Sequence, residues 1–356
     1  MFEKISVNSL KYKTSELPNI PTNECVLPAL TAGIQNQGLN NYVPRDNATI
    51  LKNVISISAN GANTGVTFYQ SKEFTVLQDA YAIKWIYTDE KLSDNSYIFL
   101  TSSIHKTIYG NYEWTNKAGW ERIKNDKIKL PTKNGKIDFD FMESFIAELE
   151  AERVAELSAY LKVSGYDNYE LSADEVDALR KFETLEWNSF NLKDLFGQST
   201  RGKRLKGADR ISGTLPFVTA GEADEGISAY ISNDVEVFEK NTTTIDMFGS
   251  AKYRNYKYGA DDHIAVVHTE KLPKYASIFV TTAIHKSSHN GQFNYGKNFY
   301  AKDADELFIQ LPVKNGTPDF ETMELLISSV HKLVIKDVVL YSDKKIAATK
   351  KIVSDN

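Results

Sequence analysis

The segment Leu215-Pro-Phe-Val-Thr-Ala-Gly221 decides how the chain is organised, because it occurs twice. The first copy is Leu27-Pro-Ala-Leu-Thr-Ala-Gly33, and in both copies a glycine and a tyrosine follow at the same spacing. Self-similarity at a fixed distance is the signature of a repeated structural unit. The sequence therefore predicts that the chain contains two related units.

Two further blocks return in the same order. Tyr97-Ile-Phe-Leu-Thr-Ser-Ser-Ile-His-Lys106 corresponds to Ser277-Ile-Phe-Val-Thr-Thr-Ala-Ile-His-Lys286. Ile128-Lys-Leu-Pro-Thr-Lys-Asn-Gly135 corresponds to Ile309-Gln-Leu-Pro-Val-Lys-Asn-Gly316, and in both copies Asp-Phe and Met-Glu pairs follow. Three blocks separated by roughly 180 to 190 residues indicate a tandem duplication of nearly the whole chain.

Each copy begins with short β-like runs between Gly, Asn and Asp turns, for example residues 50–58 and 242–247. A helix is expected around each Ile-His-Lys sequence. Asp94 or Ser96 is the expected N-cap of the first of these helices, and Pro273 fits near the start of the second. Both units are therefore predicted to be mixed α/β domains.

After the Lys-Asn-Gly turns, each copy ends in a longer amphipathic helix whose apolar side chains recur every three or four residues. Such a stripe is suited to packing against a partner helix. The stripes comprise Met142, Ile146, Leu149, Leu157 and Leu161 in the first copy and Met323, Ile327, Val330, Val334 and Val338 in the second.

We predict an α+β fold in which two pseudo-symmetric mixed α/β domains, residues 1–138 and 186–318, are separated by two long helical arms, residues 139–185 and 319–356. The first arm leads into the second domain and the second arm leaves it, so the arms pack most easily as an antiparallel pair. A helix of about 20 residues spans roughly 30 Å, close to one turn of B-DNA at about 34 Å. The arms therefore have the length of a spacer that would hold the two domains about one turn of B-DNA apart.

The composition is that of a globular protein, with 356 residues, 42% hydrophobic and 25% charged, and a formal net charge of -5. The negative charge is concentrated in residues 138–187, which contain 14 acidic and 4 basic residues, whereas the remainder contains 33 acidic and 38 basic residues. A mildly basic remainder is compatible with a nucleic-acid partner. No apolar run reaches the roughly 18 to 20 residues that span a bilayer, and the single cysteine, Cys25, suits a reducing compartment. We therefore expect a cytoplasmic protein without a membrane partner.

The repeated blocks, most clearly residues 215–221 with Tyr230-Ile-Ser-Asn233 and Asp246-Met-Phe-Gly249, resemble the specificity subunits of type I restriction-modification systems and the related type IIB subunits. The resemblance covers nearly the whole chain, although residues 164–186 are longer and more acidic than a minimal connector. It implies two target-recognition domains that each read half of a split double-stranded DNA site. It also implies that the chain is not itself an enzyme and docks methyltransferase subunits, which bring S-adenosylmethionine. Whether an endonuclease subunit also binds stays open.

Two domains that read different half-sites should share their scaffold and differ where they contact bases. Arg and Lys read guanine, Asn and Gln read adenine, and tyrosines stack or bond phosphates. The segments that differ follow the shared glycines and the shared Ile-His-Lys sequences, although an ordinary polar loop is the alternative for any one residue. The DNA-contact candidates are Asn63, Thr64, Tyr69, Gln70, Lys72, Tyr109, Asn111, Tyr112, Lys117 and Arg122, with Trp114 and Asn116, in the first domain, and Lys252, Tyr253, Arg254, Tyr256, Lys257, Ser288, His289, Asn290, Gln292, Asn294 and Lys297, with Tyr295, in the second.

Other shared or basic residues have both structural and DNA-binding interpretations. Arg201, Lys203 and Arg204, in the densest basic cluster, could contact phosphates or form a solvated loop. His105-Lys106 and His285-Lys286 end helices, where cations suit the helix dipole, so a structural role is preferred over a phosphate contact. The shared glycines are expected in backbone conformations that favour glycine, and they are Gly33, Gly61, Gly221, Gly249 and those of the two Lys-Asn-Gly turns.

Motifs for catalysis are absent from the sequence. It contains no Gly-x-x-x-x-Gly-Lys-Ser/Thr loop, no His-Glu-x-x-His, no Gly-x-Ser-x-Gly and no Cys/His cluster. We therefore expect neither a cofactor nor a metal in this chain, and no methylation or cleavage by the isolated protein. Two alternatives remain, a duplicated-domain nuclease that uses scattered carboxylates and a tandem module that binds protein or glycan.

Overall fold

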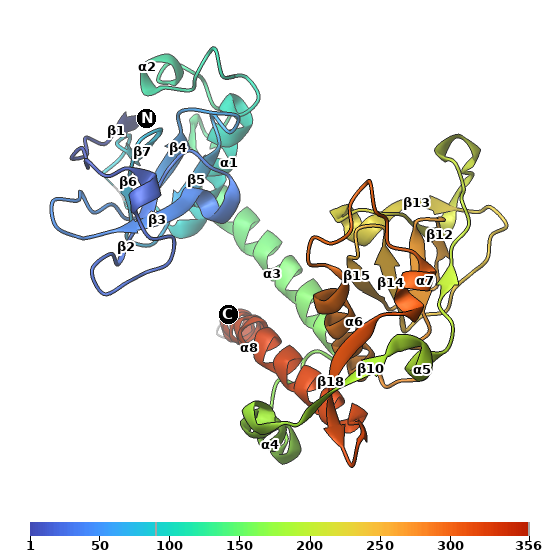
Figure 1. Cartoon of the computed structure of the whole chain (residues 1–356). Coiled ribbons are helices and arrows are strands. Elements are labelled where there is room, and N and C mark those ends of the chain that lie inside the picture. Colours follow the sequence, from blue (N-terminus) through green and yellow to red (C-terminus); the bar gives the residue numbers. More distant parts are fainter. Residues whose placement is uncertain (90, 355–356) are drawn as a thin grey trace. The chain divides into compact units, whose positions relative to one another are not determined.

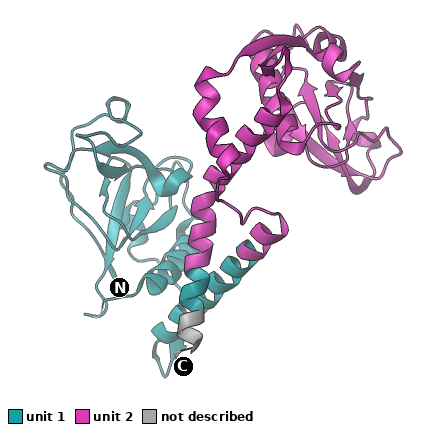
Figure 2. Ribbon diagram, turned by 90° about the horizontal axis from the view of Figure 1, so that it is seen from below, with its two compact units in different colours: residues 1–157, 345–356 teal, residues 158–344 magenta. Residues whose placement is uncertain are grey.

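The computed structural model describes residues 1–89 and 91–354 and divides the chain into two compact units (Figure 2). One unit comprises residues 1–157 with the C-terminal residues from Lys345, and the other comprises residues 158–344. Each unit contains one α/β domain, which we call domain 1 and domain 2, and parts of two long helices. Within the described residues, no helix combines the length and apolarity needed to cross a membrane.

Domain 1 is built on a four-stranded sheet of order β1-β7-β4-β5 with a smaller sheet of order β3-β2-β6 (Figure 1). Helix α1 packs on the larger sheet, and its Leu100 and Ile104 belong to the same buried cluster as Ile55 and Ile83. The elements are β1 Phe2–Lys4, β2 Leu27–Leu30, β3 Leu39–Val43, β4 Val54–Ser58, β5 Thr67–Gln70, β6 Thr75–Val76, β7 Ala80–Trp85, α1 Asp94–Ile108, α2 Trp120–Ile123, β8 Thr132–Lys133 and β9 Lys136–Ile137, with 3-10 turns at Thr14–Glu16 and Gln35–Gly38.

Domain 2 repeats this plan with sheets of order β11-β17-β14-β15 and β13-β12-β16, and adds a sheet of order β10-β18-β19. The elements are β10 Trp187–Asn191, α5 Leu192–Phe196, β11 Thr200–Arg201, β12 Ser212–Val218, β13 Ile227–Ile231, β14 Thr242–Asp246, β15 Ala251–Arg254, β16 Gly259–Ala260, β17 Ile264–Val267, α6 Lys274–Ser288, α7 Ala301–Asp305, β18 Phe308–Lys314 and β19 Thr317–Pro318, with 3-10 turns at Gly207–Asp209 and Ala223–Gly226. The matching strand orders confirm the predicted duplication of a mixed α/β domain.

The repeated Met-Glu pair has the same structural role in both units. Met142 and Met323 are fully buried in the two domain cores. Glu143 accepts hydrogen bonds from the side chains of Ser93 and Asn95 at the start of α1. Glu324 accepts one from the backbone N–H of Ala276, in the first turn of α6, at 2.7 Å. Each glutamate therefore ties a long helix to the positive N-terminal end of its neighbour.

The long helices are α3, Phe139–Val163, and α8, Phe320–Ser354, and the connection after α3 contains α4, Ala173–Lys181, and a 3-10 turn at Phe182–Thr184. The predicted apolar stripe of α8 is buried at Met323, but Val330, Val334 and Val338 are 48%, 73% and 38% exposed. The other side chains that α8 buries lie outside the predicted stripe and are Leu326, Ser329, Val339 and Ser342.

Two serines stand where α4 docks on α8 through polar contacts. Glu175 of α4 accepts hydrogen bonds from Ser328 at 2.6 Å and from Lys332 at 2.9 Å, and its backbone carbonyl accepts one from Ser329. A side chain larger than serine at 329 would hold the two helices apart. In α3 the correction is smaller, since Leu149 is 40% exposed and Val154 is buried.

Two local expectations also need correction. Ser93, rather than Asp94 or Ser96, caps α1, because its hydroxyl accepts a hydrogen bond from the Ser96 N–H. Gly33 does not have a positive φ, so its conformation does not require glycine. The Lys-Asn-Gly turns do, since Asn134 and Gly135, like their counterparts in the second copy, both have positive φ, as a two-residue hairpin turn of this type demands. Pro273 precedes α6 as predicted.

Candidate nucleic-acid interface

In domain 1, the two segments in which the copies differ lie side by side. The first, residues 59–66, connects β4 to β5, and the second, residues 109–119, follows α1. The Thr64 hydroxyl accepts a hydrogen bond from the Ala118 N–H at 2.9 Å. A Cβ on Gly61 would lie 4.0 Å from the Trp114 ring, which places the tips of the two segments in contact. We call these segments loop pair 1.

Domain 2 brings its two differing segments together in the same way. Residues 247–250 connect β14 to β15, and residues 289–298 follow α6. The Ser288 hydroxyl donates to the Gly249 carbonyl at 2.6 Å, and the rings of Phe248 and Tyr295 meet edge to face at 5.1 Å. Gly249 has a φ of +83°, and a Cβ there would lie 2.2 Å from the backbone carbonyl oxygen of Ser288, so the contact requires glycine. We call these segments loop pair 2.

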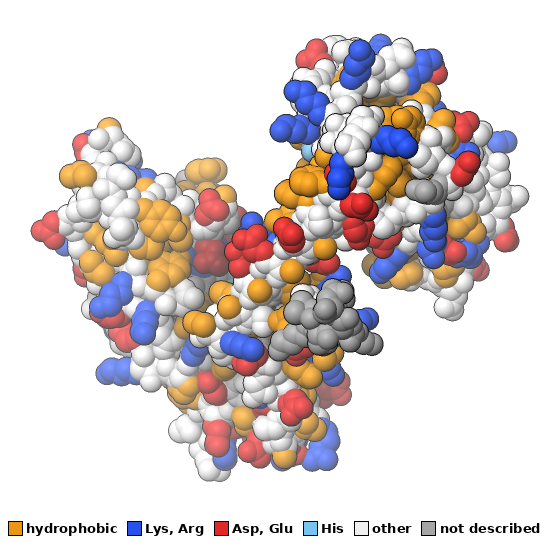
Figure 3. Space-filling model, turned by 180° about the vertical axis from the view of Figure 1, so that it is seen from behind, with side chains coloured by type: hydrophobic (Ala, Val, Ile, Leu, Met, Phe, Trp, Pro, Cys, Tyr) orange, Lys and Arg blue, Asp and Glu red, His pale blue; other side chains and the backbone are white. Residues whose placement is uncertain are grey.

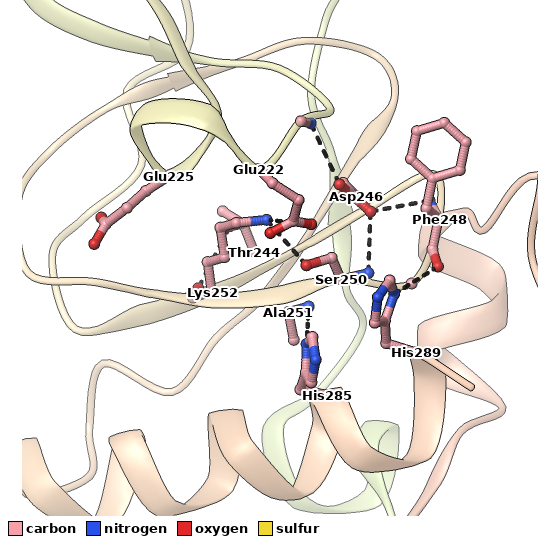
Figure 4. A network of polar contacts seen from close by, with 12 residues as sticks. Glu222, Glu225, Thr244, Asp246, Phe248, Ser250, Ala251, Lys252, His285 and His289 are labelled. Atoms are coloured by element: carbon pink, nitrogen blue, oxygen red, sulfur yellow. Dashed lines mark hydrogen bonds and ion pairs between the residues drawn. The ribbon is translucent and has the colours of Figure 1, made fainter. Parts of the chain in front are cut away.

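A buried carboxylate fixes the base of loop pair 2 (Figure 4). Asp246, which is 3% exposed, accepts hydrogen bonds from the N–H groups of Phe248 at 2.9 Å and Ser250 at 3.0 Å, so the hairpin wraps around it. Beside it, Lys252 donates to Glu222 at 3.2 Å and to Ser250 at 3.0 Å. The hydrogen bond with Ser250, and then that with Lys252, lowers the pKa of Glu222, which keeps this carboxylate charged. The hairpin is therefore rigidly supported.

The repeated histidines join each helix to the neighbouring strand. Nδ1 of His105 accepts a hydrogen bond from the Thr67 N–H at 3.3 Å, and Nδ1 of His285 accepts one from the Ala251 N–H at 3.1 Å. Burial lowers the pKa of both imidazoles, so both are neutral acceptors at pH 7. The structural role predicted for these residues agrees with the geometry. The reason given for it was wrong for the histidines, because they are not cations at the helix ends.

Loop pair 1 exposes amide, basic and aromatic side chains together. Lys117 lies over the Trp114 ring at 5.7 Å, and Trp114 itself is 66% exposed. Arg122 donates to the Asn116 side chain at 2.9 Å, so that arginine and amide form one hydrogen-bonded surface. The predicted contact residues of domain 1 that are exposed are Lys72, Tyr109, Asn111, Trp114, Asn116, Lys117 and Arg122.

Loop pair 2 presents a comparable surface with different side chains. A small hairpin places Asn294 and Lys297 opposite each other, and their backbone groups exchange two hydrogen bonds of 3.0 Å. Tyr295, between them, is 86% exposed. The predicted contact residues that are exposed here are His289, Asn290, Gln292, Asn294 and Lys297, and Lys257 is exposed elsewhere in the domain. Equivalent places on the two scaffolds thus carry different hydrogen-bonding groups.

Three predicted contact residues are buried and cannot present their side chains to a base edge in this structure. Thr64 and Ser288 are 2% and 0% exposed, and their hydroxyls hold the loops described above. Arg254 is 1% exposed, and its guanidinium donates to Thr244, to Tyr256 and to the Glu225 carbonyl at 2.8–2.9 Å. A polar residue type in a variable segment does not reveal whether it supports the loop or faces solvent.

Other predicted residues are half-buried and already engaged. Tyr69 stacks on Tyr97 at 4.9 Å and donates to Asp94 at 2.6 Å, and burial, with this hydrogen bond, raises the pKa of its hydroxyl. Tyr112 donates to Asp126 at 2.8 Å. The remaining half-buried candidates are Asn63, Gln70, Lys252, Tyr253 and Tyr256.

The basic cluster lies against an acidic pair. Arg201 donates to the carbonyl and the carboxylate of Asp262 at 2.7 and 3.3 Å, and Arg204 lies 3.8 Å from the same carboxylate. Lys203 lies 3.8 Å from Glu236. Within the described residues, Asp261, Asp262 and His263 are the one group whose ligand atoms are close enough to hold a metal. Because the arginines already supply positive charge to Asp262, this group is better explained as their counter-charge than as a metal site.

Sequence reasoning quoted Asp246 and Phe248 only within the family resemblance and missed that they organise loop pair 2. Asp246 ends a β-like run and stands three residues before the shared Gly249, a spacing typical of an aspartate that caps a turn through its own loop N–H groups. That signal was available. The edge-to-face contact of Phe248 with Tyr295 was not, because it joins residues that are far apart in the chain.

One α/β scaffold that occurs twice, with an exposed and variable loop pair at the same place on each copy, defines a duplicated recognition protein. Its fold is similar to the crystal structure of the type I restriction-modification system S subunit from M. genitalium, with a TM-score of 0.60, 17% identity, and 99% of this chain and 91% of that chain covered. The type II restriction enzyme BgcI specificity subunit S.BcgI of Heyndrickxia coagulans is 27% identical over 250 residues, 68% of this chain and 69% of that protein.

The sequence matches the type I restriction modification DNA specificity domain over residues 4–159 and again over residues 184–337. The two matched segments cover most of the chain and coincide with the two copies of the fold. The chain therefore belongs to this family and carries two of its domains.

Proposed function

We propose that the chain recognises a bipartite double-stranded DNA site as the specificity subunit of a restriction-modification system. The observation that carries this proposal is the repetition of one scaffold with two different loop pairs. Each loop pair exposes amide and basic side chains, the types that read base edges in the major groove. The family match and the similarity to the S.BcgI specificity subunit support the same role.

Each loop pair then reads one half-site. In loop pair 2, Gln292 and Asn294 are suited to adenine, and Lys297 to guanine or a phosphate. In loop pair 1, Asn111 has the corresponding role, with Lys117 and the neighbouring Arg122 of α2 as the cations. Arg201 and its neighbours contact phosphates, which positions the domain without reading sequence.

The long helices act as the spacer between the half-sites and pack as an antiparallel pair. Helix α3 has 25 residues and is therefore about 37 Å long. Two contacts support the antiparallel direction. Lys345 of α8 pairs with Glu150 of α3 at 2.6 Å, whereas His331, earlier in α8, packs on Tyr166, just beyond the end of α3. Insertion of one helical turn into both arms should change the gap between half-sites and leave their sequences unchanged.

The chain itself supplies recognition, and partner subunits supply the chemistry. Methyltransferase subunits dock on the arms and bring S-adenosylmethionine, and in a system that also cleaves, an endonuclease joins them in the cytoplasm. Exposed apolar side chains support docking on the helices, since Val330, Leu333 and Val334 of α8 are 48%, 49% and 73% exposed. Figure 3 shows hydrophobic side chains at the surface along the helical region.

The test is selection of binding sites from a randomised DNA pool by the purified chain, alone and with its copurified partners. We expect two short conserved half-sites at a fixed gap. Replacing Gln292 and Asn294 by Ala should relax one half-site, at a cost of about 10- to 100-fold in affinity per base pair lost, and leave the other unchanged. Asn111→Ala is the matched variant for the other half-site. Methylation or cleavage of DNA by the isolated chain, or binding without sequence preference, would contradict the proposal.

A further inference from the structure

Both loop pairs carry an exposed aromatic side chain on the same kind of hairpin turn. In loop pair 1 the backbone groups of Glu113 and Asn116 exchange two hydrogen bonds of 3.1 Å, and Trp114 is the first of the two residues between them. In loop pair 2 the hairpin described above has the same two hydrogen bonds, and Tyr295 occupies the place of Trp114. The two side chains, which we call the tip aromatics, are therefore structural counterparts.

Comparison of the two copies by sequence alone hides this correspondence. Equal distances from the shared His-Lys pairs match Trp114 with Asn294, because the second copy has an extra residue before the turn. Matched by their hydrogen bonds, the turns are Glu-Trp-Thr-Asn and Asn-Tyr-Gly-Lys, and what they have in common is the aromatic ring. A feature shared by two domains that read different half-sites cannot be specific to one half-site. The tip aromatics therefore have a task that is common to both domains.

Each tip aromatic is supported from the other loop of its pair and still faces solvent. The Trp114 ring lies 4.0 Å from the position that a Cβ on Gly61 would occupy, and Tyr295 meets Phe248 edge to face at 5.1 Å. Gly61 and Phe248 lie in the corresponding loops, which connect β4 to β5 and β14 to β15. The exposures of 66% for Trp114 and 86% for Tyr295 leave most of each ring in water. Each ring is thus held at the surface with a large apolar area that a flat partner could cover.

A lysine accompanies each tip aromatic. The Nζ atom of Lys117 lies 5.7 Å from the centroid of the Trp114 ring, and Lys297 closes the turn that carries Tyr295. A base step in DNA offers a flat aromatic face together with a flanking phosphate, so a ring with a lysine beside it matches both. An apolar protein surface would cover the ring but would leave the lysine without a counter-charge. The combination therefore favours DNA over an apolar protein surface as the partner of the rings.

We propose that Trp114 and Tyr295 act as wedges, each of which enters one base step of the DNA and stacks on a base whatever its identity. Aromatic stacking tolerates any sequence because every base has a π-face. Apolar side chains that enter a base step unstack it in part and kink the duplex. The tip aromatics thus contribute affinity and local DNA shape, whereas the amide and basic side chains around them read the half-sites. This inference rests on the proposed DNA recognition and assigns a separate task within it.

The first experiment measures how tightly the full chain, with its copurified partners, binds a duplex with both selected half-sites and duplexes with one base pair changed. Trp114→Ala and Tyr295→Ala should each weaken binding about 10- to 100-fold on all of these duplexes, so that the discrimination between them is kept. Trp114→Phe and Tyr295→Phe should retain most of the affinity, because they keep a ring. Tyr87 and Tyr230, which are 59% and 56% exposed outside the loop pairs, are the matched controls, and their replacement by Ala should not change the affinity.

The second experiment detects the opened step directly. The duplex carries 2-aminopurine, a base whose fluorescence depends on its stacking, at successive positions through and beside each half-site. The original chain and the Phe variants should change the emission at one step for each half-site, and each Ala variant should abolish the change at its own half-site alone.

The outcomes separate this inference from the proposed function. Half-site selection by the original chain together with undiminished binding by both Ala variants, or without any change in 2-aminopurine emission, overturns the wedges and leaves DNA recognition intact. Loss of discrimination between the duplexes in the Ala variants also overturns them, because the rings would then read base identity. If the original chain selects no half-sites at all, the proposed function fails and the wedges fail with it.

Discussion

Arg254 distinguishes most sharply between a residue that supports the recognition surface and one that belongs to it. Its residue type and its variable segment predict a contact with DNA, whereas the structure buries its guanidinium. The three hydrogen bonds of that group reach Thr244 at 2.9 Å, Tyr256 at 2.9 Å and the carbonyl of Glu225 at 2.8 Å. Glu225 lies in the β12–β13 turn with a φ of 55°, so Arg254 holds this turn against β14.

We expect Arg254→Met, which keeps the side-chain length, to lower the free energy of unfolding of domain 2 by about 3 kcal/mol. Hydrogen bonds to a charged group contribute about 1.5–3 kcal/mol each. The net loss is smaller than the sum of the three hydrogen bonds, because the variant no longer has to bury a charged guanidinium. The loss that we expect is close to the one seen when one partner of a buried pair is removed. For a unit of this size the melting temperature should fall by about 6–12 °C.

The assay is thermal unfolding followed by DNA binding at a temperature at which the variant is folded. Arg254→Met should melt earlier and still bind DNA within about twofold of the original chain. Lys297→Ala, at an exposed position of loop pair 2, is the control and should show the opposite pattern. An unchanged melting temperature together with lost affinity would refute the structural role.

Three further predictions concern protons and backbone space. Burial lowers the pKa of His105 and His285 below the usual value near 6.5. The unfolded chain therefore takes up protons first, and the fold loses stability as the pH falls below about 6.5. A chain with His105→Asn and His285→Asn should show a flatter slope of melting temperature against pH. Burial alone would raise the pKa of Glu175, but hydrogen bonds from Ser328 and Lys332 lower it to about 2. Glu175→Gln should therefore lower the free energy of unfolding by about 2 kcal/mol at neutral pH. In denaturant titrations this difference should vanish as the pH falls from about 4.5 to about 2. Gly249→Ala should destabilise domain 2 by about 2–3 kcal/mol, because its Cβ would clash with Ser288. Gly291 has a similar φ of +85° and open space around it, so Gly291→Ala should cost about 1 kcal/mol. Equal losses in denaturant melts would disprove the clash.

The candidate site was predictable as segments but not as individual residues. Comparing the two copies predicted the segments that the structure brings together in each loop pair, because the shared scaffold stands out from the stretches where the copies diverge. The comparison could not distinguish Lys297, which is exposed, from Arg254, which is buried. Arg254 hydrogen-bonds Tyr256, two residues further along the chain. The exposure of a polar side chain depends on which distant elements pack against its strand, and that information is absent from the local sequence.

The sequence by itself determined the duplication, the mixed α/β character of both domains and where the two long helices start, because hydrophobic periodicity, turn residues and internal similarity are local properties. Tertiary structure alone decided which face of α8 is buried, since Glu175 of α4 contacts serines on α8 rather than the valine stripe. It also decided that Arg254 is buried and that Lys297 is exposed. Both depend on contacts between residues far apart in the chain, whose free energies arise only when the chain folds.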